Sequence, residues 1–142
     1  MMVTATGNLI FRLLGTPAAV GLARSITDAR LCKWDCLHIL DDALLVVSEL
    51  VTNATRQTPY EEIRFQVVRD SPGIVIAVWD SSPDLPQPKP ITELTLEDLD
   101  LSEEAFDDNG GWGLPIVQAL SSKCGITRDP GGGKWTWARL VA

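Results

Sequence analysis

The sequence predicts an α+β fold, a two-layer sandwich in which helices cover one face of a mostly antiparallel, mixed sheet. Two helical stretches follow an opening strand, a strand hairpin comes next, and a further helix leads to a second hairpin. Helices and strands that are grouped along the chain rather than alternating regularly are typical of this class. With 142 residues, 45% of them hydrophobic, residues 1–142 are expected to form a single domain with one core.

The first half of the chain is expected to form a strand and two helices. NLIFRLLG predicts a short strand, and Thr16 followed by Pro17 is typical of an N-cap with proline at the first helical position, so a helix should run to about Trp34. A second helix is expected over residues 39–57, ending before Pro59, because apolar residues recur there at helical spacing. These residues are Leu40, Leu44, Val47, Val51 and Ala54.

The second half is expected to contain two hairpins separated by a long loop and a helix. IRFQVVR and GIVIAVWD, joined by DSPG, predict the first hairpin. Residues 81–110 are rich in proline and carboxylates, and a loop of that length in a compact domain is typical of a lid, a binding loop or disorder. We expect a mobile acidic lid. After GGWG, a helix is expected from Leu114 to about Lys123. GITRD and KWTWARLV then predict the last hairpin.

Charge and composition exclude several classes of protein. A net charge of -7 with no cluster of lysine and arginine argues against binding nucleic acid, whose phosphates require positive charge. No apolar run reaches the length of a membrane span, and the first residues lack the layout of a signal peptide, so we expect a cytoplasmic protein without membrane contact. Cys32, Cys36 and Cys124 are expected to be reduced core thiols, and Cys32 and Cys36 with His38 fall short of a zinc set.

Two polar residues interrupt the apolar pattern of the second helix. Glu49 and Asn53 are four residues apart in LLVVSELVTNATRQ, so they share one helix face. By themselves they fit a solvated stripe on an amphipathic helix equally well. In a catalytic site, Asn53 would offer an oxygen suited to Mg²⁺ beside phosphate, and Glu49 would orient or deprotonate a nucleophile.

Further residues favour the catalytic interpretation. Asp80 ends an apolar strand, where a carboxylate can accept a hydrogen bond from an amine such as that of adenine. Gly111 and Gly113 precede a predicted helix, where backbone N–H groups and the helix dipole can approach a phosphate. Together these features indicate a nucleotide site.

Four segments carry a resemblance to a known family. ELVTNA, VWDSSP, GGWGLPIV and GKWTWARL, in that order, resemble the GHKL ATPase superfamily with its Bergerat nucleotide-binding fold, also called the histidine-kinase-like ATPase fold. The closest resemblance is to the anti-sigma-factor serine kinases of Gram-positive bacteria, and it covers most of the chain. It implies ATP and Mg²⁺ as cofactors. It also implies a sigma factor and a small antagonist protein, phosphorylated on serine, as partners, commonly with a homodimeric kinase.

The resemblance also implies roles for individual residues. Glu49 resembles the general base, and Asn53 resembles the Mg²⁺ ligand. The nucleotide-binding positions implied by the resemblance are Asn53, Asp80, Gly111, Gly113, Leu114 and Thr136.

The chain departs from the family pattern at several positions. Gln57 stands where a histidine is common, and Trp135 stands where a small hydroxyl would face adenine, which moves the hydroxyl to Thr136. Between residues 84 and 108 the only basic residue is Lys89. Two functions therefore remain open: an ATP-dependent serine kinase, and a nucleotide-dependent protein that sequesters a regulator without phosphotransfer.

Three further side chains are expected to have structural roles. Lys134 and Arg56 are expected to be exposed charges rather than phosphate partners. Trp135 and Trp137 are expected to pack on one face of the sheet.

Overall fold

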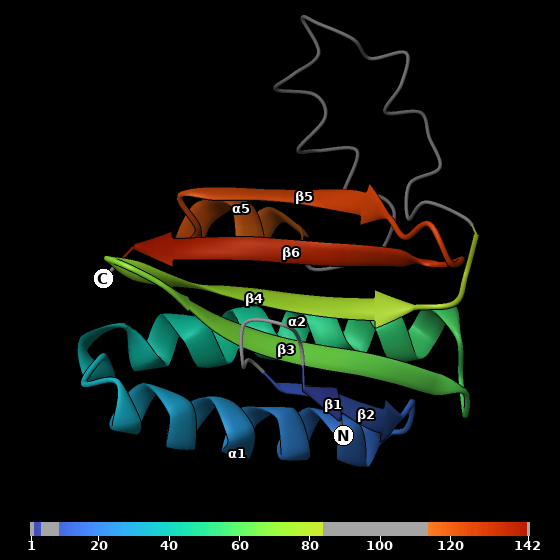
Figure 1. The fold of residues 1–142 in the computed structure, drawn as a ribbon, viewed down its shortest axis with the longest axis horizontal. Helices are drawn as coiled ribbons and strands as arrows, with labels where there is room; N and C mark the ends of the chain where they lie inside the picture. The colour runs from blue at the N-terminus through green and yellow to red at the C-terminus, as the bar shows by residue number, and fades with distance from the viewer. Residues whose placement is uncertain (1, 4–8, 84–113, 142) are drawn as a thin grey trace, which may run out of the picture.

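The computed structural model describes residues 2–3, 9–83 and 114–141. Within these residues the chain forms one six-stranded sheet with its helices packed on one face (Figure 1). The strand order is β1-β2-β3-β4-β6-β5, and each described neighbouring pair is antiparallel. The strands are β1 (Met2–Val3), β2 (Leu9–Leu14), β3 (Glu62–Asp70), β4 (Gly73–Asp80), β5 (Lys123–Arg128) and β6 (Lys134–Val141). The predicted α+β class is confirmed, and the described sheet is antiparallel rather than mixed.

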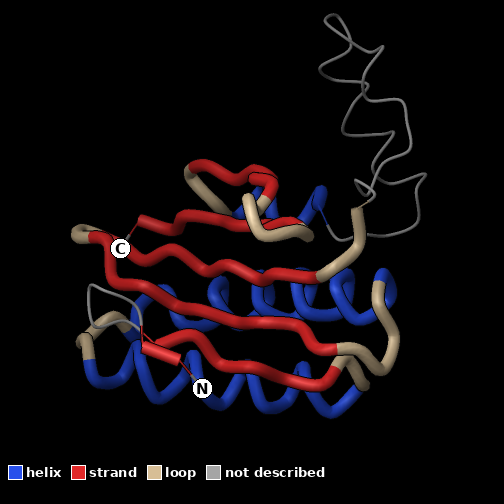
Figure 2. Tube along the Cα trace, turned by 45° about the vertical axis from the view of Figure 1, so that its right-hand side comes forward, coloured by secondary structure: helices blue, strands red, loops and turns tan. Residues whose placement is uncertain are grey.

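Two long helices form most of the second layer. Helices α1 (Pro17–Lys33) and α2 (Leu40–Gln57) are joined through a short 3₁₀ helix, η1 (Leu37–Ile39), and lie side by side under the sheet (Figures 1 and 2). The shorter α5 (Leu114–Leu120) packs beside α2. Helix α2 buries a continuous apolar stripe against β4 because its apolar residues recur every three or four positions.

The predicted elements correspond closely to the observed ones. Thr16 is the N-cap of α1 with Pro17 at the first helical position, although the Thr16 side chain accepts no capping hydrogen bond. The prediction that the last helix continues to Lys123 is wrong, because α5 ends at Leu120 and Lys123 begins β5. Strand β1 was not predicted. Of the predicted lid over residues 81–110, all but residues 81–83 lie outside the described part of the chain.

Strand alternation divides the central strands into two faces. Along β6 the buried residues are Lys134, Thr136, Ala138 and Leu140, which face the helices. Trp135 and Trp137 occupy the intervening positions and lie half-buried on the opposite face, as successive residues of a strand must. The two tryptophans therefore pack on one sheet face as predicted. Trp135 therefore lies on the sheet face opposite Thr136.

Candidate functional site

A buried ion pair lies where β4 ends and β6 begins. Asp80 is the register partner of Lys134 in the antiparallel β4–β6 ladder. The Lys134 Nζ atom is 2.8 Å from Asp80 Oδ1, and the two side chains are 0% and 1% exposed, respectively. The carboxylate predicted to receive adenine is therefore held against a buried ammonium group.

A glycine-rich turn brings these two strand ends together. The Asp129 N–H donates to the Gly133 carbonyl over 3.0 Å, which closes the β5–β6 turn. Gly133 has a φ of +78°, and a Cβ atom at this position would lie 2.4 Å from the Asp80 carbonyl oxygen. Only glycine tolerates both conditions, so the GGG sequence positions Lys134 directly beside Asp80.

Burial and hydrogen bonding act in opposite directions on Asp80. Burial raises the pKa of the Asp80 carboxyl above its usual range, whereas the Lys134 ammonium and the Ser82 backbone N–H lower it. The Ser82 N–H donates to Oδ1 over 3.0 Å, so both contacts fall on the same carboxylate oxygen. A buried charge is tolerated when it is paired and hydrogen-bonded in this way.

Helix α2 contributes a second set of polar groups to this end of the sheet. Lys134 Nζ donates to Gln57 Oε1 over 3.3 Å, which shows that this side of α2 faces the start of β6. Asn53 lies one turn earlier, shares the face of Gln57, and is only 5% exposed. Glu49 lies a further turn back and is half-buried. The structure thus brings Asn53 to the layer that contains Asp80, with Glu49 on the same helix.

Thr136 completes the polar group on the sheet. It is two residues after Lys134 and shares its face, which places it roughly 6.5 Å further along the strand. Its Oγ1 atom is buried and has no hydrogen-bond partner among the residues that the structure describes. Because an unsatisfied buried hydroxyl costs about 1–3 kcal/mol, Thr136 is suited to bind a ligand. This end of the sheet therefore combines the Asp80 carboxylate, the Lys134 ammonium, the Asn53 amide and the unpaired Thr136 hydroxyl. Such a combination fits a nucleotide and its metal ion.

Not every sequence-predicted residue can be placed. Gly111 and Gly113 lie outside the described residues, and Leu114 begins α5 without a described side chain. Lys134 was expected to be an exposed charge, and that prediction is wrong because its side chain is fully buried. The signal that could have identified it is the strand register, since GKWTWARL places Lys134 on the buried face with Thr136. Arg56 is exposed as predicted.

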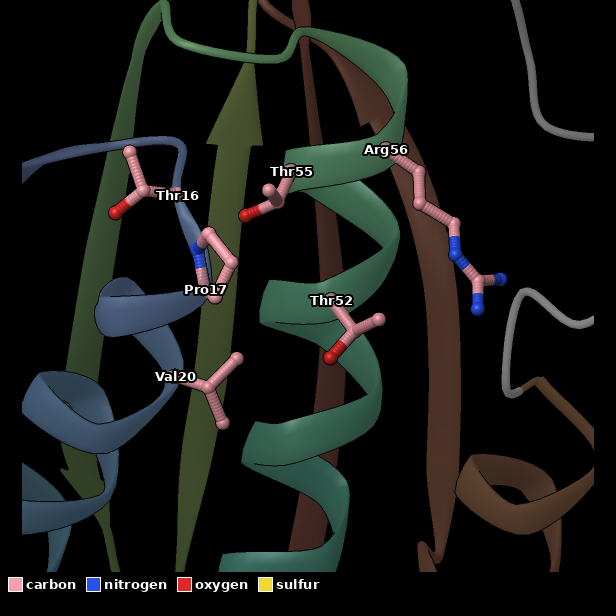
Figure 3. A pocket seen from close by; sticks show the side chains of 6 residues that line it. All are labelled: Thr16, Pro17, Val20, Thr52, Thr55 and Arg56. Atoms are coloured by element: carbon pink, nitrogen blue, oxygen red, sulfur yellow. The ribbon is translucent and has the colours of Figure 1, made fainter.

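A separate cleft lies between the start of α1 and the second half of α2 (Figure 3). It has a volume of about 240 Å³ and contains Thr55, whose buried Oγ1 also has no partner within the described ranges. Figure 3 shows the Thr55 hydroxyl turned toward α1, while the Arg56 guanidinium points away from it. None of the residues of the Asp80 group lines this cleft. The lining residues are Thr16, Pro17, Val20, Thr52, Thr55 and Arg56.

The cysteines do not all behave as predicted. Cys36 is buried and Cys124 is half-buried, but Cys32 is exposed, so the prediction of core thiols is wrong for Cys32. In the described ranges, no three histidine, cysteine, aspartate or glutamate side chains are grouped as a metal site would require. No described helix combines the length and apolar character needed to cross a membrane.

Comparison with known proteins identifies the family. The sequence profile of the histidine kinase-like ATPase domain matches residues 14–140, which extend from the end of β2 almost to the end of β6. The chain belongs to the histidine kinase-like ATPase family. This family is part of the GHKL superfamily, whose ATP-binding domains have the Bergerat fold and use Mg²⁺. No curated protein matches the chain significantly.

Proposed function

We propose that this histidine kinase-like ATPase domain is a regulatory protein that binds Mg-ATP, phosphorylates a serine of a small antagonist protein and sequesters a sigma factor. The observation that supports this function best is the convergence of Asp80, Thr136 and Asn53 at one end of the sheet. Convergent polar groups within a largely apolar layer are typical of cofactor sites.

Each of these side chains has a distinct task in the proposed nucleotide site. The Asp80 carboxylate accepts a hydrogen bond from the exocyclic amine of adenine, and the Thr136 hydroxyl supplies a further polar contact to the base. The Asn53 side-chain oxygen is a ligand for Mg²⁺, which keeps most of its other positions for phosphate and water. Gly111 and Gly113 are the proposed phosphate-binding glycines, and Leu114 begins the helix that follows them.

The net charge of the chain supports a metal-dependent site. At -7, the protein repels a polyphosphate unless a cation is bound with it. The Lys134 ammonium does not supply that charge, because it is already paired with Asp80. Mg²⁺ held through Asn53 neutralises the phosphates in the proposed complex.

Glu49 supports the kinase rather than a simple nucleotide-binding protein. It lies one helical turn from Asn53 and is half-buried. In phosphoryl transfer a carboxylate near the metal accepts the proton of the attacking hydroxyl, here a serine of the partner protein. A protein that only binds nucleotide does not require this group.

A second function is favoured by one feature of the sequence. Residues 84–108 contain Lys89 as their only basic residue, although sites that transfer a phosphoryl group normally use cationic groups to neutralise the γ-phosphate. A nucleotide-dependent protein that sequesters a regulator without phosphotransfer would not need such a group. This is the alternative function of the same site.

One experiment distinguishes the two functions. Purified protein is incubated with Mg-ATP and a candidate antagonist, and the phosphate on that antagonist is measured by mass spectrometry. We expect phosphorylation of one serine, with none when Mg²⁺ is chelated. If credible antagonists bind the protein but acquire no phosphate, the sequestering function replaces the kinase. Light scattering on the same sample tests the proposed homodimer.

A further inference from the structure

Lys134 is a polar residue of the site to which the proposed function gives no task. Its ammonium group lies 2.8 Å from Asp80 Oδ1 and 3.3 Å from Gln57 Oε1. Its side chain is fully buried, so it is not available as a general surface charge. A buried lysine is costly, and its position beside the proposed base acceptor requires an explanation beyond stability.

The hydrogen-bonding capacity of this pair exceeds the contacts that it makes with described residues. An ammonium group has three N–H donors, and the contacts to Asp80 and Gln57 use two of them. A carboxylate can accept about four hydrogen bonds through its two oxygens. The two contacts to Asp80, from Lys134 and the Ser82 N–H, both fall on Oδ1. The contacts with described residues therefore leave one N–H of Lys134 and acceptor capacity on Asp80 unused, side by side.

Adenine carries the complementary groups on adjacent atoms of its Watson–Crick edge. The exocyclic amine at position 6 is a donor, and the neighbouring ring nitrogen N1 is an acceptor. We propose that Lys134 is a specificity-determining residue whose ammonium donates to N1 of adenine while Asp80 accepts from the amine. This inference rests on the proposed nucleotide site and adds a second contact to the base.

The same arrangement rejects guanine. Guanine has a carbonyl oxygen at position 6 and an N–H at position 1, which reverses both groups relative to adenine. Its carbonyl would meet the Asp80 carboxylate, and its N–H would meet the Lys134 ammonium. In a buried site, an acceptor that faces an acceptor and a donor that faces a donor have no water to bind instead. Such a site therefore discriminates strongly against guanine.

Gln57 gives the lysine a fixed direction. Its Oε1 accepts from Lys134 Nζ across the gap between α2 and β6, a contact between residues 77 positions apart. A second acceptor restricts the rotation of a flexible four-carbon side chain, and this restriction lowers the entropy lost when the remaining N–H binds a ligand. Gln57 is thus a positioning residue in the proposed recognition of the base.

The first test uses nucleotide analogues with the parent protein and needs no substitution. Calorimetry in the presence of Mg²⁺ compares ATP with 1-deaza-ATP, which has a C–H in place of N1. We expect the analogue to bind about ten- to a hundredfold more weakly, as for a lost hydrogen bond to a charged group. 7-Deaza-ATP, altered on the other edge of the purine, is the matched control and should bind like ATP. GTP should show no measurable binding.

The second test assigns the effect to Lys134. In Lys134→Met, ATP affinity should fall and the difference between ATP and 1-deaza-ATP should disappear. Lys123→Met, which removes an exposed lysine of β5, should keep both affinities of the parent. Circular dichroism establishes whether Lys134→Met is folded. If Lys134→Met is not folded, Gln57→Leu is the second variant. It should reduce the ratio of the affinity for ATP to the affinity for 1-deaza-ATP.

Three results would overturn the inference. Equal binding of ATP and 1-deaza-ATP by the parent excludes a contact to N1. If a folded Lys134→Met variant still binds ATP more tightly than 1-deaza-ATP by the same factor as the parent, another group makes the contact to N1. Tighter ATP binding by Lys134→Met would show that the lysine competes with the base. The proposed function fails separately, if the parent binds no adenine nucleotide at all.

Discussion

The Asp80 carboxylate and the Lys134 ammonium meet 2.8 Å apart beneath the sheet, although the two residues are 54 positions apart in the chain. They meet because β4 ends where β6 begins and because the glycine turn before Lys134 allows close approach. The pair holds the proposed base acceptor in a fixed position and leaves no uncompensated charge in the core.

Asp80→Asn should weaken ATP binding by about 1.5–3 kcal/mol, the usual value of a hydrogen bond to a charged group. Asparagine replaces one acceptor oxygen with a donor that faces the adenine amine. Calorimetry with Mg-ATP measures the loss. Asp70→Asn is the matched control, because Asp70 also ends a strand and accepts from a cation of β6, Arg139, but on the half-exposed surface. Unchanged affinity in Asp80→Asn would remove Asp80 from the site.

Lys134→Met should reduce the free energy of unfolding by about 3–5 kcal/mol, because it leaves a buried carboxylate without its partner. Arg139→Met breaks the half-exposed pair with Asp70 and should cost less than about 1 kcal/mol. Urea denaturation of the two variants makes the comparison. Similar losses in both would mean that burial of the Asp80–Lys134 pair has little energetic consequence.

The pH dependence of stability should reveal the raised pKa of Asp80. When the folded-state pKa of an acid exceeds its unfolded value, the folded protein binds more protons, so the contribution to stability falls as the pH rises. The double variant Asp80→Asn/Lys134→Met is the reference, because it lacks the Asp80 carboxyl and leaves no unpaired ammonium in its place. The parent should lose stability relative to this reference as the pH rises from about 4 through the raised pKa. If the parent instead gains stability relative to the double variant over that pH range, the pKa of Asp80 is not raised.

Much of the fold could be predicted from the sequence because its periodic patterns are long. Helix α2 runs over 18 residues with regular apolar spacing, and its predicted and observed ends agree within one residue. Strand β1 has two residues, too few for any period to be recognised. The end of α5 was misplaced because Lys123, a good helix former, is recruited into β5 by pairing with β6.

The candidate site was predictable only in part. Asp80 and Asn53 could be proposed as site residues because each depends on local position, the end of a strand or the spacing along a helix, and their roles stay predictions. The alternation of GKWTWARL could have placed Lys134 on the buried face with Thr136. Its pairing with Asp80 could not be predicted, because it depends on the register between β4 and β6. For the same reason the contact between Gln57 and Lys134 could not be anticipated.

Asn53→Ala should weaken the dependence of ATP binding on Mg²⁺, because it removes the proposed oxygen ligand of the metal. Titration of Mg²⁺ at a fixed ATP concentration measures the change. Thr52→Ala is a suitable control, since the neighbouring Thr52 faces the cleft beside α1 instead of the sheet (Figure 3). If Asn53→Ala retains the Mg²⁺ dependence of the parent, the metal has a different ligand.

Glu49→Gln should separate binding from chemistry. A general base acts on the attacking hydroxyl and contributes mainly in the transition state, so the variant should bind ATP and its partner protein nearly as tightly as the parent. Transfer should slow by at least roughly a hundredfold, since general bases contribute about 10²–10⁴-fold. A single-turnover transfer assay and a pull-down, run side by side, measure both properties.

Glu62→Gln provides the control for Glu49→Gln, because Glu62 is an exposed carboxylate on β3 that pairs with Arg64, away from α2. It should transfer phosphate at the parent rate. Transfer that survives Glu49→Gln would refute the base assignment, because no step would then depend on that carboxylate. If the parent itself transfers nothing while Glu49→Gln changes only affinity, the protein is a sequestering module. Glu49 is then either a retained relic or a residue that contacts the metal through water.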